Sequence, residues 1–179
     1  SIIAVVALIA LLAAVALLRP EATLDEAMST AGQPTEQVAP ATAAPPGSPW
    51  RYGRTNARYT VVEYADLECP YCRAYFPVLK RWIDAHPEVN LQWHHLPLSM
   101  HEPAASQGAR LVECVGEAGG SAAFWQAVEW VYTHTRGDGQ GLPEGSRYPG
   151  LSLTVRQCLE SDRPDTVVRA QAAAAAQAN

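Results

Sequence analysis

Two patterns of apolar residues meet near the middle of the chain. Residues 59–65 (YTVVEYA) are β-branched, aromatic and nearly continuously apolar, which predicts a strand that is buried on both faces. Apolar residues then recur at helical spacing until His86 and Pro87 end the run, so one stripe of a helix is expected to face a sheet. This stripe comprises Tyr75, Phe76, Leu79, Trp82 and Ile83. The sequence CPYC at 69–72 therefore lies in a turn between a strand and a helix.

Further along, the pattern predicts a second strand and more helices. Residues 89–95 alternate, and the odd-numbered positions are expected to face inward. Residues 121–132 have helical spacing after two glycines, with Ser121 as the N-cap. Residues 142–150 are rich in Pro and Gly, which is typical of a surface connection, and 164–179 begin like a helix and end in an alanine run. Together these elements predict an α/β domain.

The first part of the chain predicts a membrane anchor. Residues 1–18 are apolar apart from Ser1 and would extend about 27 Å as a helix, which nearly spans a bilayer. A cleaved signal peptide and a buried core helix are the alternatives. Arg19 and Pro20 follow where a cleavage site would need small residues, and the next charges are acidic, which favours an uncleaved anchor with the rest of the chain outside the cytoplasm.

Composition divides the remainder into a linker and one domain. Residues 19–50 are rich in Pro, Ala and Thr and show no sustained apolar period, so they predict a flexible tether. Residues 51–179 are long enough for a single domain with its own core. The net charge is −5 and the basic residues are scattered, so no nucleic-acid surface is expected.

The CPYC turn carries the chemistry. Pro70 suits the first position of a helix, and the unpaired N–H groups of that first turn would stabilise a thiolate at Cys69. Cys69 is therefore expected to attack or to be attacked. Cys72, one turn deeper, would then resolve a mixed disulfide. The competing hypothesis, a zinc site, is disfavoured because no second CxxC and no HxxxH pair accompanies the first motif.

Three segments resemble the DsbA/DsbG-like periplasmic thiol:disulfide oxidoreductases of the thioredoxin superfamily, from about Gly53 onward. VEYADLECPYC resembles their active-site strand and turn, HHLPLSMHEPAA the exit of their next strand, and AAFWQAVEWVY their helical insertion. Pro77 falls where thioredoxins kink this helix; a simple helix break is the alternative. The resemblance implies a thioredoxin-like α/β fold with an insertion at about 103–163.

Glu63 lies six residues before Cys69, where the superfamily often carries a buried acid. A carboxyl group in a buried strand has a raised pKa and could exchange a proton with Cys72. We therefore include Glu63 among the catalytic residues as a hypothesis; the alternative is a side chain that reaches solvent at the end of the sheet. His101 could lie near the active site as in similar proteins, or cap a helix, and it is given no catalytic role.

Cys114 and Cys158 lie on either side of the helix predicted at 121–132. The number of cysteines is even, an export signal precedes them, and several DsbA-like proteins carry such a pair, so a structural Cys114–Cys158 disulfide is predicted. Two buried free thiols are the alternative.

The predicted anchor and the resemblance together imply a membrane-tethered thiol:disulfide oxidoreductase without a cofactor, located at a bacterial inner membrane with its catalytic domain in the periplasm. Its partners would be cysteine-containing exported proteins and a membrane or periplasmic redox partner. Pro70-Tyr71 is more similar to DsbG-like and glutaredoxin-like centres than to DsbA, so isomerase or reductase activity stays open, although no dimerisation domain is evident. A non-enzymatic chaperone or metal-delivery factor is the other alternative.

One expected feature of the family is missing. Members normally carry a cis-proline loop facing the CxxC, followed by further strands and a final helix, whereas no proline follows Pro164 here. A sequence truncated at its C-terminus is therefore expected, with an incomplete sheet that lacks its substrate clamp.

Overall fold

The computed structural model describes residues 48–177. The predicted anchor at 1–18 and most of the predicted linker lie outside this range. Within the described residues, no helix is both long and apolar enough to cross a bilayer. The elements are β1 Arg51–Gly53, β2 Tyr59–Ala65, α3 Pro70–Ala85, β3 Val89–His95, the 3-10 turn η1 Ser99–His101, α4 Ala104–His134, α5 Leu153–Leu159 and α6 Arg163–Gln177.

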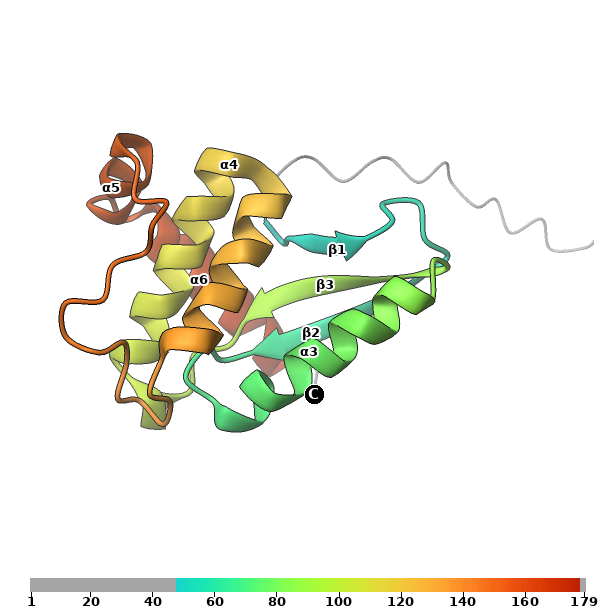
Figure 1. Ribbon diagram of the computed structural model, residues 1–179, viewed down its shortest axis with the longest axis horizontal. Coiled ribbons are helices and arrows are strands. Elements are labelled where there is room, and N and C mark those ends of the chain that lie inside the picture. The colour runs from blue at the N-terminus through green and yellow to red at the C-terminus, as the bar shows by residue number, and fades with distance from the viewer. Residues whose placement is uncertain (1–47, 178–179) are drawn as a thin grey trace, which may run out of the picture. The chain divides into compact units, whose positions relative to one another are not determined.

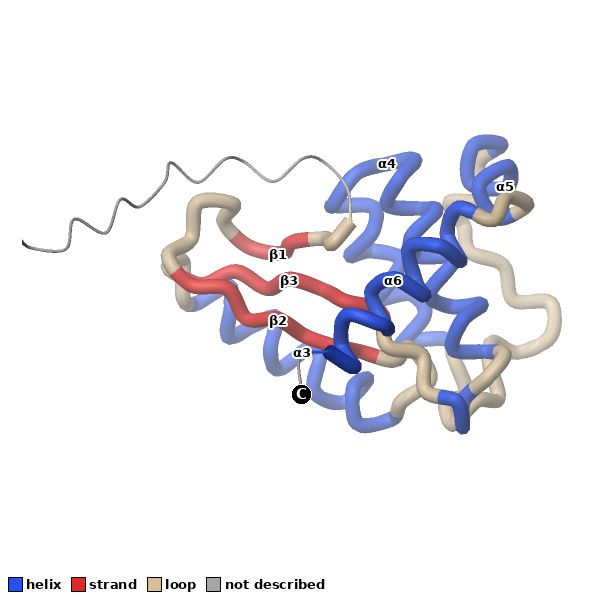
Figure 2. The backbone as a smooth tube through the Cα atoms, turned by 180° about the vertical axis from the view of Figure 1, so that it is seen from behind, coloured by secondary structure: helices blue, strands red, loops and turns tan. Residues whose placement is uncertain are grey.

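The described part of the chain forms a three-stranded sheet in the order β1-β3-β2 (Figure 1). β3 pairs antiparallel with β1 and parallel with β2, and Glu63 lies opposite Trp93. Both views show α3 and α6 on opposite faces of the sheet (Figure 2). The connection from β2 through α3 to β3 is the usual helical crossover between parallel strands, and it places the CPYC turn at the carboxyl end of β2.

The prediction that residues 59–65 are buried on both faces is wrong. Tyr59 and Val62 are 52% and 44% exposed, and only Ala65 is fully buried. Among the described strands β2 pairs with β3 alone, so it forms an edge of this sheet. Its apolar composition alone could not distinguish an edge strand from a central one.

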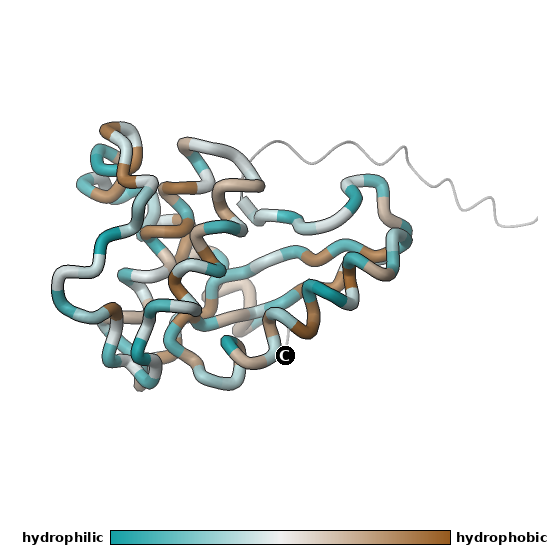
Figure 3. Tube along the Cα trace, viewed as in Figure 1, coloured by the Kyte–Doolittle hydropathy of each residue, from teal (hydrophilic) through white to brown (hydrophobic). Residues whose placement is uncertain are grey.

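Helix α3 begins at Pro70 and ends at Ala85, close to the predicted bounds, but its buried stripe is narrower than predicted. Phe76, Leu79 and Ile83 are buried, whereas Tyr75 and Trp82 are 56% and 42% exposed. Pro77 lies inside the helix without dividing it into two elements. In Figure 3 the most hydrophobic parts of the tube include segments of α3, β3 and α4.

Helix α4 reverses direction at Gly120, whose φ of 79° and ψ of −173° are not helical. A Cβ added at Gly116 would lie 3.0 Å from the Cβ of Phe124, a separation that eight residues of straight helix could not allow. The two halves of α4 therefore lie side by side (Figure 1). The helix predicted at 121–132 is the second half, and α5 and β1 were not predicted.

An aromatic cluster fills the core between the sheet and α4. Trp50 stacks on Phe124 at 5.2 Å between ring centroids, and Trp93 contacts Phe76 and Phe124 edge-on. A buried acid in this core is paired: the Trp50 indole N–H donates to Glu113 at 2.8 Å. This hydrogen bond offsets part of the cost of burying the Glu113 carboxyl group, which is 1% exposed, in an apolar core.

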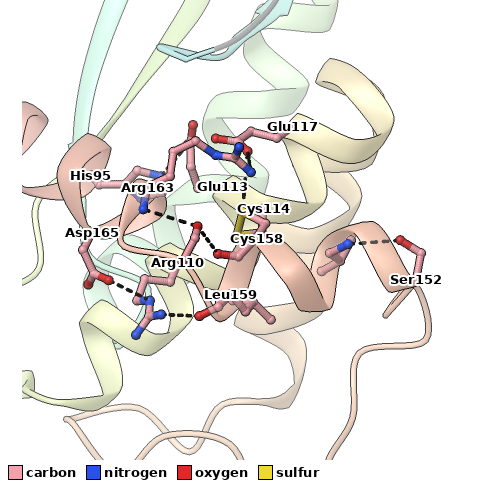
Figure 4. The surroundings of a disulfide bond; sticks show 12 residues. His95, Arg110, Glu113, Cys114, Glu117, Ser152, Cys158, Leu159, Arg163 and Asp165 are labelled. Atoms are coloured by element: carbon pink, nitrogen blue, oxygen red, sulfur yellow. Dashed lines mark hydrogen bonds and ion pairs between the residues drawn. A yellow bond between two sulfur atoms is a disulfide. The ribbon is translucent and has the colours of Figure 1, made fainter.

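The structure joins Cys114 of α4 to Cys158 of α5, the pair expected from the sequence, with their Cα atoms 5.6 Å apart (Figure 4). Ion pairs surround this bond. Arg163 approaches Glu117 at 2.8 Å, and Arg110 approaches Asp165 at 3.3 Å, so the start of α6 is also tied to α4. The disulfide and these ion pairs fasten α5 and α6 to α4.

Candidate dithiol active site

The dithiol lies where β2 passes into α3. Cys69 is the N-cap residue of α3 in an extended conformation, with φ −74° and ψ 120°, and Pro70 follows at the start of the helix. The carbonyl of Cys69 accepts a hydrogen bond from the Arg73 N–H at 3.0 Å, which closes the first turn. Cys69 and Cys72 are both free thiols and both partly exposed. An incoming sulfur can therefore reach this site.

The Cys72 thiol is hard to ionise because of its burial. The pKa of Cys72 is raised to about 11, and the largest cause is burial. The hydrogen bond between Cys72 and Cys69 and the charges of Cys69 and Glu63 also raise this pKa. A backbone hydrogen bond from Asp66 opposes this shift. Cys72 is therefore protonated at neutral pH and needs a base before it can attack.

Glu63 is a candidate for that base. Burial raises the pKa of Glu63 to about 7, so this carboxyl group exchanges its proton near neutral pH. Its Oε2 is buried and has no hydrogen-bond partner among the described residues. The side chain does not reach freely into solvent, which was the alternative considered above. A catalytic role for Glu63 remains a prediction.

The site also contains two acids that the sequence analysis missed. Asp66 is 3% exposed, and its carboxylate accepts hydrogen bonds from the backbone N–H groups of Glu68 at 2.7 Å and Leu98 at 2.9 Å. It also pairs with Nδ1 of His101 at 2.7 Å. Asp66 thus ties the active-site turn to the segment that leads into α4, and His101 is a buried partner of this acid, not a helix cap.

Glu68, immediately before Cys69, is the second missed acid. It is 2% exposed and receives hydrogen bonds from Thr135 and Gly141, which follow α4. Tyr132, near the end of α4, donates to the backbone oxygen of Asp66 at 3.3 Å. Burial raises the pKa of Tyr132 well above its usual range, so this hydroxyl stays a donor. The segment before α4, the last turn of α4 and the loop after it therefore all contact the active-site turn.

Exposed apolar side chains flank the dithiol. Tyr71, between the two cysteines, is 84% exposed, and Met100 of η1 is 76% exposed. Leu98, whose N–H is held by Asp66, adds a further apolar side chain to this surface. Such side chains offer contact area to an unfolded polypeptide.

No group of three or more His, Cys, Asp or Glu side chains within residues 48–177 has the arrangement needed to hold a metal ion. The four cysteines form two pairs in different chemical states. Cys69 and Cys72 are free thiols, and Cys114 and Cys158 form a disulfide.

A strand, a CxxC turn and a helix, with a buried acid in the strand, define the dithiol site of the thioredoxin fold. A family model described as "Thioredoxin" matches residues 46–179, and the chain belongs to this family. The crystal structure of DsbA2 from Pseudomonas aeruginosa is similar with a TM-score of 0.69 and 44% sequence identity, covering 74% of each chain. The chain is therefore a DsbA-like member of the thioredoxin superfamily, as the resemblance predicted.

More distant structures share the fold. The thiol-disulfide exchange protein α-DsbA2 from Wolbachia pipientis is 12% identical, with a TM-score of 0.54 over 69% of this chain and 66% of its own.

Among curated proteins, the Na(+)/H(+) antiporter NhaA 3 of Salinispora tropica is 38% identical over 82 residues, which are 46% of this chain and 12% of the antiporter. The NhaA 1 antiporter of Salinispora arenicola matches at 35% over the same length. The chain thus spans about an eighth of these relatives.

Proposed function

We propose that the protein is a membrane-tethered, extracytoplasmic thiol:disulfide oxidoreductase that acts on cysteines of exported proteins. The observation that carries this proposal is the free dithiol at the start of α3, with Cys69 at the helix N-terminus and Cys72 protonated near a buried acid. The name of the Wolbachia neighbour, a thiol-disulfide exchange protein, supports the same activity.

The exchange proceeds in two steps. In the oxidised form, a client thiolate attacks the sulfur of Cys69, and the Cys69–Cys72 bond breaks to release the Cys72 thiolate. Neutral Glu63 can protonate this thiolate, which has a pKa of about 11 and is therefore strongly basic. A second client thiolate then attacks the client sulfur of the mixed disulfide and releases the Cys69 thiolate. The client loses two electrons to the dithiol, and a disulfide of the redox partner must take them up.

Two features support tethering to a membrane. Residues 1–18 have the apolar composition of a membrane-spanning helix, and 19–50 have that of a flexible linker. In addition, the relatives named above that match 82 residues of this chain are Na(+)/H(+) antiporters, which act at membranes. We infer a bacterial inner-membrane protein whose domain at 51–179 faces the periplasm.

The direction of electron flow decides between the oxidase and its alternatives. The reduction potential of Cys69/Cys72 is to be measured by alkylation and mass spectrometry across glutathione ratios. A potential between about −120 and −180 mV supports oxidase or isomerase activity, and one near about −270 mV a reductase. If the dithiol does not titrate, the oxidoreductase proposal is wrong, and a redox-inactive chaperone or metal-delivery factor takes its place.

The proton-transfer hypothesis has a separate test. Glu63→Gln keeps the shape of the side chain but cannot change its charge, so the exchange rate is expected to fall at least several-fold and to lose its inflection near pH 7. Stopped-flow measurement of client oxidation from pH 5 to 9 provides the profile. An unchanged rate at every pH would show that Glu63 transfers no proton.

A further inference from the structure

The segment that follows α4, residues 135–141, forms a loop that requires support. Gly137, Gly139 and Gly141 have positive φ, and so does Asp138 between them at 51°. A Cβ at Gly139 would lie 2.9 Å from the Cα of His101, so the loop packs directly against the backbone of η1. We call this segment the glycine loop. Its glycines retain more freedom in the unfolded chain than other residues, and ordering them is costly.

Glu68 holds the glycine loop at three points. Its carboxylate accepts hydrogen bonds from the Thr135 hydroxyl at the start of the loop and from the Gly141 N–H, 2.9 Å away, at its end. The backbone oxygen of Glu68 accepts a third bond from the Asp138 N–H at 2.8 Å. With 2% exposure, this carboxylate depends on such donors for its solvation.

These bonds also fix the peptide group that joins Glu68 to Cys69. The oxygen of this peptide is bonded to Asp138, and its N–H, which belongs to Cys69, donates to the backbone oxygen of Asp66 at 3.2 Å. The peptide plane before Cys69 is therefore held from both sides. Both bonds are between backbone groups and neither involves the Glu68 side chain, so they can form without that side chain.

The glycine loop lies beside the dithiol and adds polar side chains to its surroundings. Arg136, Asp138 and Gln140 are exposed, whereas Tyr71 and Met100 supply apolar surface near the same turn. A small thiol needs only access to a sulfur atom. A polypeptide client must also fit the surface around that atom, so it is sensitive to the position of the loop.

We propose that Glu68 is a positioning residue that holds the glycine loop as one wall of the client-binding surface beside Cys69. This wall favours protein clients over small thiols. The inference rests on the proposed oxidoreductase function. Losing the side chain frees the loop and weakens the binding of a polypeptide, while the reaction of the dithiol with a small thiol continues.

The test compares two substrates on the full chain: a peptide containing two cysteines, and glutathione. Glu68→Ala is expected to raise KM for the peptide roughly five- to tenfold, the effect of losing one or two buried hydrogen bonds, and to change the glutathione rate by less than about twofold. Glu68→Gln is expected to restore the KM, because its amide can accept from Gly141 and donate to the Thr135 hydroxyl oxygen.

Glu113→Ala is the matched control, because Glu113 is also a buried acid, at 1% exposure, but contacts Trp50 and His95 in the core. It is expected to lower stability without changing the ratio of peptide to glutathione rates. Thr135→Val removes the hydroxyl that donates to Glu68 and accepts from the Gly137 N–H. It should shift the same ratio in the direction of Glu68→Ala, and it replaces Glu68→Ala in the test if that variant does not fold.

Two results would overturn the inference. If Glu68→Ala and Thr135→Val slow both substrates in parallel, as Glu113→Ala would through stability, Glu68 supports the fold and not client binding. The inference is also wrong if the KM for the peptide is unchanged in both Glu68→Ala and Thr135→Val. If the wild type is no faster than Cys69→Ser with either substrate, the proposed function fails as well, so the two failures are distinguishable.

Discussion

Three acidic side chains lie close to the dithiol, and each has different partners. Asp66 and Glu68 are fully buried and accept several hydrogen bonds, whereas one carboxylate oxygen of Glu63 has no partner among the described residues. Hydrogen bonds stabilise a carboxylate, and desolvation without them stabilises the neutral acid. Glu63 is therefore the acid suited to proton transfer, and the other two are suited to holding structure.

At the scale of single residues, the sequence predicts the site residues that belong to the CxxC motif or lie at a fixed distance from it along the chain. Cys69, Cys72, Pro70 and Glu63 follow from the motif and the resemblance. Asp66 and Glu68 were missed because their roles depend on residues 35 to 73 positions away, such as His101 and Gly141. The signal that could have indicated them is the presence of two acids directly after an apolar strand, where burial is expected.

Burial of Glu63 makes stability depend on pH. Its pKa is raised from 4.5 to about 7, so the folded state retains a proton that the unfolded chain releases, and this stabilising contribution is lost as pH rises from about 4.5 through 7. Glu63→Gln is therefore expected to be more stable relative to wild type at pH 8 than at pH 4, by up to about 3 kcal/mol. Urea unfolding at both pH values provides the comparison. An equal difference at the two pH values would contradict this.

Cys72 should react slowly with alkylating reagents. Its pKa, raised mainly by burial from 9.0 to about 11, leaves about a hundredfold less thiolate at pH 8 than an ordinary cysteine would have. A Cys69→Ser variant keeps the burial of Cys72 but removes the contributions of Cys69. Alkylation of Cys72 in this variant by iodoacetamide at pH 8 is expected to be slower than in the same variant unfolded in urea, by up to about this factor. Comparable rates in the two states would show that burial does not protect this thiol.

At the scale of elements, periodicity predicted which segments form helices but not always which residues they bury. The strand at 59–65 proved to be half exposed, and the stripe on α3 excludes Tyr75 and Trp82. Apolar character specifies that a side chain gains from burial, whereas the neighbours that bury it come from elsewhere in the chain. The three-residue β1 and the seven-residue α5 are too short to show a period.

The bond between α4 and α5 makes a testable contribution to stability. Cys114 and Cys158 are 44 residues apart, and closing a loop of this length stabilises the fold by about 4 kcal/mol in the chain-entropy model. The double variant Cys114→Ser/Cys158→Ser is expected to lose stability of this order in urea unfolding. Cys69→Ser/Cys72→Ser, which keeps the bond, is the control. An unchanged unfolding midpoint in the first variant would contradict the prediction.

At the scale of the whole molecule, the comparisons place the domain in the thioredoxin family, and the N-terminal composition supports a tether. Removing residues 1–18 is expected to move the protein from the membrane fraction to the soluble fraction while the exchange rate of the dithiol stays the same, because the anchor and the domain are separate segments. Deleting residues 22–39 of the linker is the matched control. Retention of the shortened protein in carbonate-washed membranes would exclude residues 1–18 as the anchor.

The contacts between the active-site turn and the end of α4 also affect when the site can assemble. Arg73 bonds to Thr135 and Glu68 to Gly141, across 62 and 73 residues of chain. During synthesis at about 5–20 residues per second, both cysteines leave the ribosome several seconds before their supports. The dithiol then exists as an unrestrained pair of thiols, open to oxidation or pairing with the wrong cysteine. The active-site turn therefore gains all its supports only when the chain has been made as far as the glycine loop.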